Sequence, residues 1–226
     1  MTQGINRLAL AVLVAGAAAA GAASAQSAGS WLVRAGATKI TPKVTSGNLT
    51  APSFAGTQAD IDSATALSGG ITYMLSDQFS LDLPLAAGFK HDIVGAGAIA
   101  GVGKIGEVKA LPITLLAQYR FLGANDALRP YVGAGPTYAK FYDARSTAAL
   151  TALTGGSPAK LTTLEVQSKW AATIQAGASF AIAPAWSIDA SVLKTFLKTR
   201  TSLSTGQTLD ATLDPLSVSV GVAYKF

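Results

Sequence analysis

The sequence predicts an all-β protein, an eight-stranded antiparallel transmembrane β-barrel with short periplasmic turns and longer extracellular loops. In most of the chain apolar residues alternate with small or polar ones, the period of a strand that has one apolar face. Half of the 226 residues are hydrophobic, yet beyond the N-terminal region no run of about 18 apolar residues could span a bilayer as a helix. Short and long connections alternate along the chain, which is the layout of an outer-membrane barrel.

The N-terminal segment has the pattern of a secretory signal peptide. Arg7 provides the positive region, residues 8–23 form an apolar core, and Ala23-Ser24-Ala25 fits the rule for cleavage between small residues. We therefore expect residues 1–25 to be removed and residues 26–226 to form the barrel in the cell outer membrane. A transmembrane anchor is the alternative, but no stop-transfer flank follows the apolar core.

The final strand is the clearest of the eight. In residues 216–226 every second residue is apolar, including Val218 and Val220, and the residues between them are small or polar. Seven further strands are expected at about residues 30–42, 64–75, 79–86, 111–121, 129–143, 170–180 and 186–192. A soluble sandwich would show the same alternation, but these strands are long and their aromatic residues gather at strand ends. Closing the sheet leaves no unpaired edge in lipid and an interior just wide enough for side chains.

The connecting segments are expected to alternate between turns and loops. Short turns are predicted at residues 76–78, 123–128 and 183–185. Longer loops are predicted at residues 43–63, 90–106, 144–168 and 200–209. This arrangement places both chain ends on the side of the short turns, which is the periplasmic side.

Composition argues against most catalytic and nucleic-acid-binding classes. The chain has no cysteine and one histidine, so thiol nucleophiles, disulfides and multi-histidine metal sites are excluded, and no cofactor or metal is expected. The net charge is +5 without a basic arm, which gives no sign of nucleic-acid binding. His91 and Asp92 form the one His–acid pair, and neighbours on a strand point to opposite faces. We predict no enzyme activity and place His91 at the outer mouth of the barrel.

Several segments together resemble the OmpW family of outer-membrane proteins, which includes AlkL-like members. They occur in family order at residues 31–37 (WLVRAGA), 70–77 (GITYMLSD), 81–84 (LDLP), 89–93 (FKHDI), 118–121 (QYRF), 129–135 (RPYVGAG) and 224–226 (YKF). The resemblance covers essentially the whole mature chain. It implies a barrel with a narrow, largely apolar channel for uptake of small hydrophobic molecules. The alternative is a non-transporting surface barrel that acts through its loops as a receptor, adhesin or stress-response protein.

The face assignment predicts a charged layer inside the periplasmic third of the barrel. Arg34, Asp82, Arg120 and Asp189 all fall on inward positions near the periplasmic ends of their strands. Because isolated charges are costly in a narrow lumen, we expect them to satisfy one another as bidentate pairs. This layer either closes the channel as a plug or only stabilises the barrel.

Above this layer the inward residues are expected to be apolar or small, including Met74, Leu116 and Leu193. Such a cavity suits a hydrophobic ligand. Pro84 and Pro112 should be near neighbours on adjacent strands, and neither can donate a ladder hydrogen bond. The seam between them is a candidate lateral exit into the lipid, or it merely bends the barrel.

The expected partners follow from the membrane location. Many basic residues, such as Lys39, Lys140 and Lys194, fall at the outer ends of strands, where they can meet the phosphates of lipopolysaccharide. The C-terminal Phe226 is a candidate contact for the barrel-assembly machinery. We expect a monomer that binds outer-membrane lipids and small hydrophobic ligands and does not bind nucleic acid.

Overall fold

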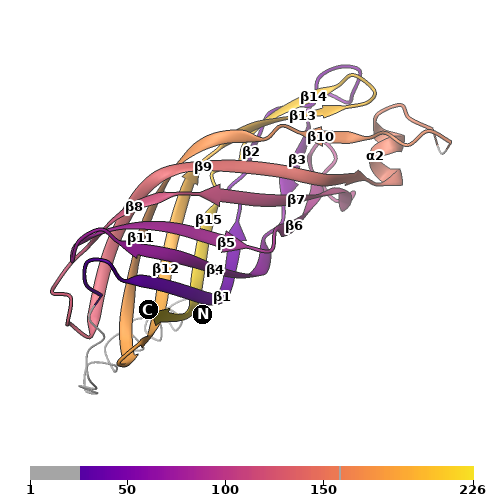
Figure 1. Cartoon of the computed structure of the whole chain (residues 1–226). Helices are drawn as coiled ribbons and strands as arrows, with labels where there is room; N and C mark the ends of the chain where they lie inside the picture. Colours follow the sequence, from indigo (N-terminus) through magenta and orange to yellow (C-terminus); the bar gives the residue numbers. More distant parts are fainter. Residues whose placement is uncertain (1–25, 158) are drawn as a thin grey trace, which may run out of the picture.

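Eight antiparallel strands close into a barrel in the computed structural model, which describes residues 26–157 and 159–226. The expected signal peptide, residues 1–25, lies outside the described residues. Each strand of the ring pairs with the next, and the last pairs with the first, so the predicted fold class is confirmed (Figure 1). In ring order the strands are β1 (Trp31–Thr41), β4 (Ala64–Met74), β5 (Phe79–Ala86), β8 (Leu116–Arg120), β9 (Leu128–Ser146), β11 (Lys169–Ala183), β12 (Trp186–Phe196) and β15 (Leu216–Lys225).

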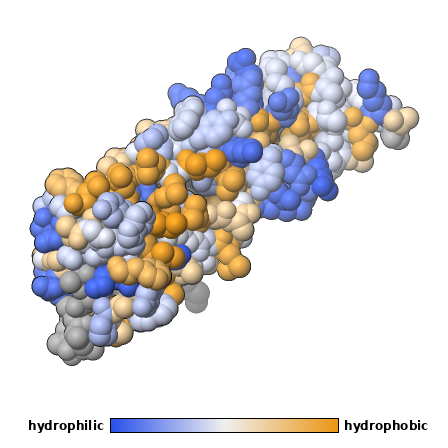
Figure 2. Space-filling view, in the orientation of Figure 1, coloured by the Kyte–Doolittle hydropathy of each residue, from blue (hydrophilic) through white to orange (hydrophobic). Residues whose placement is uncertain are grey.

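The outer wall of the ring is apolar, as the alternation requires. Val218 and Val220 of β15 are 46% and 57% exposed, whereas Ala223 on the opposite face is buried, so the predicted direction of this strand is confirmed. Figure 2 shows apolar residues over the half of the molecule formed by the ring and more hydrophilic residues over the other half. At the periplasmic strand ends, Trp186 packs on Tyr224, with ring centroids 4.8 Å apart. Aromatic rings with one polar edge are typical of the membrane–water boundary.

The expected outer loops are in large part strands, which corrects the prediction of long irregular connections. They are β2 (Thr45–Ser46), β3 (Thr57–Ile61), β6 (Phe89–Gly97), β7 (Lys104–Thr114), β10 (Leu164–Val166), β13 (Lys198–Leu203) and β14 (Thr208–Thr212), together with the short helix α2 (Ala148–Leu153). They extend the wall away from the chain termini (Figure 1). No helix within the described ranges is long and apolar enough to cross a membrane.

A second apolar core explains why these segments are ordered. Ile93, Ile105 and Val108 of β6 and β7 are buried against Leu203 and Leu209 of β13 and β14. Burying such side chains stabilises each by about 1.5–3 kcal/mol relative to exposure. These segments are rich in glycine and threonine, so the few apolar residues that form this core do not stand out as strands in the sequence.

One seam of the wall lacks ladder pairing over part of its length. Residues 79–82 of β5 pair with β8, and residues 89–94 of β6 pair with β7. Between these ladders no pair joins residues 83–88 to residues 111–115, all of which the structure describes. Each of the two stretches remains bonded on its other side, to β4 and β9 respectively. The seam is therefore a local gap between two otherwise anchored strands.

Candidate functional site

A layer of buried polar side chains lies inside the barrel near its periplasmic end and is here called the plug. Its upper tier is built around Arg34 on β1 and includes Asp82 and Asp189. Its Nη2 donates to Asp82 Oδ1 at 2.7 Å and its Nη1 donates to Thr72 Oγ1 at 2.8 Å. Its Nε lies 3.8 Å from Asp189 Oδ1, so the guanidinium stands between two carboxylates. Gly70 leaves the space for this arrangement, because a Cβ there would lie 2.5 Å from Arg34 Nη2. Arg34 thus contacts both Asp82 and Asp189, but through one oxygen of each carboxylate, so these pairs are not bidentate as predicted.

Arg120 forms a lower tier and is not paired as expected. Within the described part of the chain it has no ion-pair partner, and it donates instead to Gln26 Oε1 at 3.0 Å and Gln118 Oε1 at 3.0 Å. Its guanidinium lies 4.6 Å from the centre of the Tyr131 ring. The predicted bidentate pairing is wrong for Arg120. Leu116, and not Arg120, pairs with Asp82 across the β5–β8 ladder, so Arg120 lies closer to the periplasmic end.

Tyr131 joins the two tiers, and inspection of the sequence alone did not single it out. Its hydroxyl donates to Asp189 Oδ1 at 2.9 Å, while its ring supports Arg120. Gly177 on the neighbouring β11 makes room for the ring, because a Cβ there would lie 2.5 Å from Tyr131 Cζ. Its inward position in the alternation of β9 was the sequence feature that could have identified it.

Gln26 and Arg129 close the periplasmic end of the plug and were also missed. Gln26 is 3% exposed, and its Nε2 donates to Ser179 Oγ at 3.1 Å. Arg129 donates from Nη1 to the Gln26 carbonyl oxygen at 2.9 Å and from Nη2 to the Asp77 carbonyl oxygen at 2.5 Å. Gln26 precedes the first strand, so no strand pattern could have placed it in the lumen.

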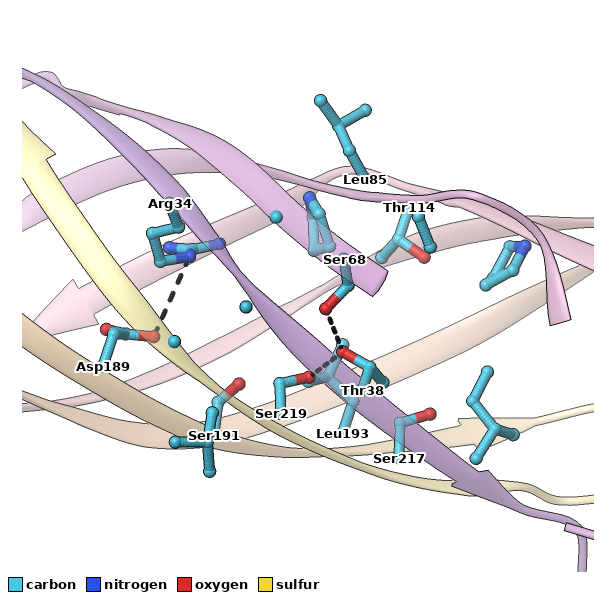
Figure 3. Close-up of a pocket in the computed structure, with 18 of the residues that line it drawn as sticks. Arg34, Thr38, Ser68, Leu85, Thr114, Asp189, Ser191, Leu193, Ser217 and Ser219 are labelled. Atoms are coloured by element: carbon cyan, nitrogen blue, oxygen red, sulfur yellow. Dashed lines mark hydrogen bonds and ion pairs between the residues drawn. The ribbon is translucent and has the colours of Figure 1, made fainter. Parts of the chain in front are cut away.

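Three cavities lie in series on the outer side of the plug. The lower cavity, of about 80 Å³, has Arg34 and Asp189 in its lining (Figure 3). It shares Pro112 with a middle cavity, and the middle cavity shares Val108 and other residues with an outer one of about 80 Å³. The shared lining shows that neighbouring cavities adjoin, so the three form a row, here called the path, between the extracellular end and the plug.

The structure separates the residues predicted to form the apolar lumen. Leu193, Pro84 and Pro112 line the lower cavity. Met74 and Leu116 are fully buried but line none of the three cavities, which corrects their predicted place above the charged layer. Met74 pairs with Ser80 on the periplasmic side of Asp82, and Leu116 pairs with Asp82 itself, because the strands of a barrel are staggered.

His91 lies inside the path and not at its mouth, which corrects its predicted position. It is 4% exposed, lines the middle cavity, and its Nδ1–H donates to the Asp62 carbonyl oxygen at 2.8 Å. The outer strands carry the wall beyond it, so the mouth is farther out. Burial lowers the pKa of His91, and the bond to Asp62 opposes that shift.

Charged residues on the outer strands pair on the surface. Lys104 Nζ lies 2.7 Å from Glu107 Oε2 and 2.8 Å from Asp92 Oδ1, and Lys90 Nζ lies 2.8 Å from Glu107 Oε2. Hydrogen bonds from Lys104 and Lys90 hold the pKa of Glu107 at about 2. These pairs lie on β6 and β7 beyond the apolar wall, so the membrane boundary falls below them.

The match with known proteins extends over the whole barrel. Residues 27–226 match the model of the OmpW family. Outer membrane protein W of Salmonella typhimurium is 33% identical over 209 residues, which cover 91% of this chain and 92% of that protein. The dibenzothiophene metabolism operon protein PahQ of Pseudomonas aeruginosa is 26% identical over 174 residues, 76% of each chain.

Solved structures agree with the sequence relatives. The crystal structure of the outer membrane protein OprG from Pseudomonas aeruginosa superposes with a TM-score of 0.79 at 27% sequence identity. The match covers 88% of this chain and 97% of that one. The family is non-enzymatic, in keeping with the isolated position of His91. The barrel is closed and these matches cover most of the chain. The chain therefore belongs to the OmpW family of outer-membrane proteins.

Proposed function

We propose that the barrel takes up small hydrophobic molecules at its extracellular end and releases them sideways into the membrane. The observation that carries this proposal is the series of cavities that ends on the polar plug beside the unpaired seam. A molecule that follows the cavities inward meets the plug ahead of it and the gap at its side.

The outer part of the path favours apolar cargo. The outer cavity is lined by side chains of the second apolar core, including Ile93, Val108 and Leu203, and the middle cavity by Ile61 and Leu197. Moving an apolar molecule from water onto such a surface is favourable by roughly 25 cal/mol per Å² of area removed from water. An ion or sugar would lose its hydration without equivalent partners.

The plug opposes exit along the axis. Arg120 is 1% exposed and donates three hydrogen bonds, and Asp82 is completely buried beside Arg34. Opening an axial pore would separate these groups, and each buried charge left without its partner costs several kcal/mol. This supports a plug that stays closed while cargo leaves by another route.

The seam is the weakest part of the wall next to the lower cavity. Pro84 and Pro112 both line that cavity, and a proline has no N–H for a ladder hydrogen bond. Leu85 also borders the cavity, but its side chain points outward and is 47% exposed, so this residue of the unpaired stretch adjoins both the cavity and the lipid (Figure 3). The anchored pairing of each strand on its far side limits the movement that exit requires.

The name of one relative points to cargo of the same kind. PahQ is named for a dibenzothiophene metabolism operon, and dibenzothiophene is an apolar aromatic compound. We extend this to the present chain as a proposal about the chemical class, namely small apolar molecules.

Crosslinking the seam tests the proposal. The chain has no cysteine, so a Leu85→Cys/Ile113→Cys pair can be bridged selectively with a short bis-maleimide. Both side chains face outward, at 47% and 47% exposure. A matched control bridges Val192→Cys with Val218→Cys, an outward pair on the fully bonded strands β12 and β15. Uptake of naphthalene is measured in vesicles with lipopolysaccharide in the outer leaflet.

The two crosslinks should have different effects. We expect the seam crosslink to reduce protein-dependent uptake at least tenfold, and the control crosslink to leave it within twofold. Unchanged uptake after complete seam crosslinking would rule out this exit. Uptake equal to that of protein-free vesicles in the uncrosslinked protein would remove the transport function and favour the surface role.

The outward lysines support contact with lipopolysaccharide. Lys39 and Lys140 are exposed on the outward faces of β1 and β9. We propose that they meet the lipid phosphates, each contributing about 1 kcal/mol near an anionic surface. Replacing both with glutamine should weaken binding of lipopolysaccharide to the folded barrel, and unchanged binding would contradict the proposal.

A further inference from the structure

The lower cavity differs chemically from the two cavities outside it. Thr38 Oγ1 lies 2.7 Å from Ser68 Oγ and 2.7 Å from Ser219 Oγ, which gives a chain of three hydroxyls on the wall (Figure 3). Ser191 and Ser217 add further hydroxyls to the same lining. Hydroxyls both donate and accept hydrogen bonds, so this surface can bind a polar group of either kind.

Most of the hydroxyls and most of the apolar lining come from different strands; Leu193 on β12 and Thr114 on β7 are exceptions. Thr38, Ser68, Ser191, Ser217 and Ser219 lie on β1, β4, β12 and β15. The strands that form the seam, β5 to β7, contribute mainly Pro84, Leu85, Ala86, Phe89 and Pro112. A bound molecule thus meets hydroxyls on one side and an apolar surface on the other, next to the proposed exit.

The charged floor of this cavity selects against ions. Arg34 stands between Asp82 and Asp189, at 2.7 Å and 3.8 Å, so its charge is already matched. A carboxylate that approached Arg34 would meet Asp189, and an ammonium that approached Asp189 would meet Arg34. An added charge would therefore lack a free counter-ion at this floor.

We infer that the lower cavity is a binding site for small amphiphiles with one neutral oxygen group, such as alcohols, aldehydes or ketones. The oxygen contacts the hydroxyls around Thr38, and the apolar body lies against Pro84 and Phe89. This inference rests on the proposed uptake function and adds to it a preference among cargo molecules. One neutral hydrogen bond contributes about 0.5–1.5 kcal/mol, so the preference over the matching hydrocarbon is about two- to tenfold.

Titration of the folded barrel in lipid nanodiscs tests the site directly. The probes are n-octane, 1-octanol and octanoate at pH 8, and binding is followed by NMR through backbone amide shifts of residues that line the lower cavity. Thr38→Val removes the central hydroxyl of the three linked hydroxyls with little change of shape. Ser191→Ala removes a lining hydroxyl that is not part of those three. Thr65→Val is the matched control, because Thr65 is an exposed residue of β4 that lines none of the three cavities.

The expected result is a half-saturating concentration for 1-octanol that is two- to tenfold below that for n-octane. Thr38→Val and Ser191→Ala should each reduce that difference, and Thr65→Val should preserve it. Equal saturation by octane and octanol in the unmodified barrel would overturn the inference, and so would octanoate binding as tightly as octanol. Vesicle uptake of naphthalene is unaffected by either of those results, so failure of this site and failure of the transport function are distinguishable.

Discussion

Replacing Asp82 with alanine tests whether the plug is a stabilising network. Asp82 is completely buried and accepts hydrogen bonds at 2.7 Å from both Arg34 Nη2 and Thr72 Oγ1. Asp82→Ala leaves Arg34, whose side chain is 11% exposed, with Asp189 at 3.8 Å as its remaining counter-ion. Removing one partner of a buried pair costs about 3–5 kcal/mol. Because Asp189 still offsets part of the charge, we expect a loss of about 3 kcal/mol.

The measurement is the free energy of unfolding in lipid vesicles, from reversible urea titrations followed by tryptophan fluorescence. Trp31, Trp170 and Trp186 are 50%, 72% and 45% exposed, so all three report loss of lipid contact. Asp62→Ala is the control, because Asp62 is an exposed residue whose backbone carbonyl, rather than its side chain, accepts from His91.

A double-mutant cycle isolates the pair itself. If Arg34 and Asp82 interact as the geometry indicates, the Arg34→Ala/Asp82→Ala variant should lose about 0.5–3 kcal/mol less than the sum of the two single variants. A cost of Asp82→Ala below about 1 kcal/mol, or additive single losses, would refute the reasoning.

Three further predictions follow. Asp82→Ala/Arg120→Ala should open an ion-conducting path in planar bilayers, because it removes a buried group from each tier of the plug. Gly177→Ala should destabilise the barrel by about 1–3 kcal/mol, because its Cβ would lie 2.5 Å from the Tyr131 ring. The carboxyl of Glu107 should titrate by NMR with a midpoint of about 2. Since this folded pKa is depressed, its stabilising contribution is present above about pH 4.5 and is lost as the pH falls toward 2.

A specific result would contradict each of these three predictions. Unaltered conductance and uptake in the Asp82/Arg120 double variant would leave the plug as a structural network without a role in closure. Gly123→Ala is the control for Gly177, since its Cβ would approach only an Asp126 side-chain oxygen at 3.1 Å. Equal stabilities of the two glycine variants would contradict the packing argument. A Glu107 midpoint at or above its ordinary value of 4.5 would show that the lysine pairs do not persist in solution.

The predicted sites show where sequence reasoning succeeded and where it stopped. Parity placed Arg34, Asp82 and Asp189 on the inner face and in contact, because alternation assigns a face to every residue of a strand. It could not place Met74 or Arg120 at the right depth, because depth depends on how neighbouring strands are staggered.

The sequence by itself determined the closed eight-stranded ring and its lipid-facing surface, since period-two alternation states which side of each strand is apolar. Only the tertiary structure decided three other features: the walls built by the outer segments, the entry of Gln26 into the lumen, and the gap between the β5–β8 and β6–β7 ladders. These features arise from contacts between residues far apart in the chain, and no local pattern encodes such contacts.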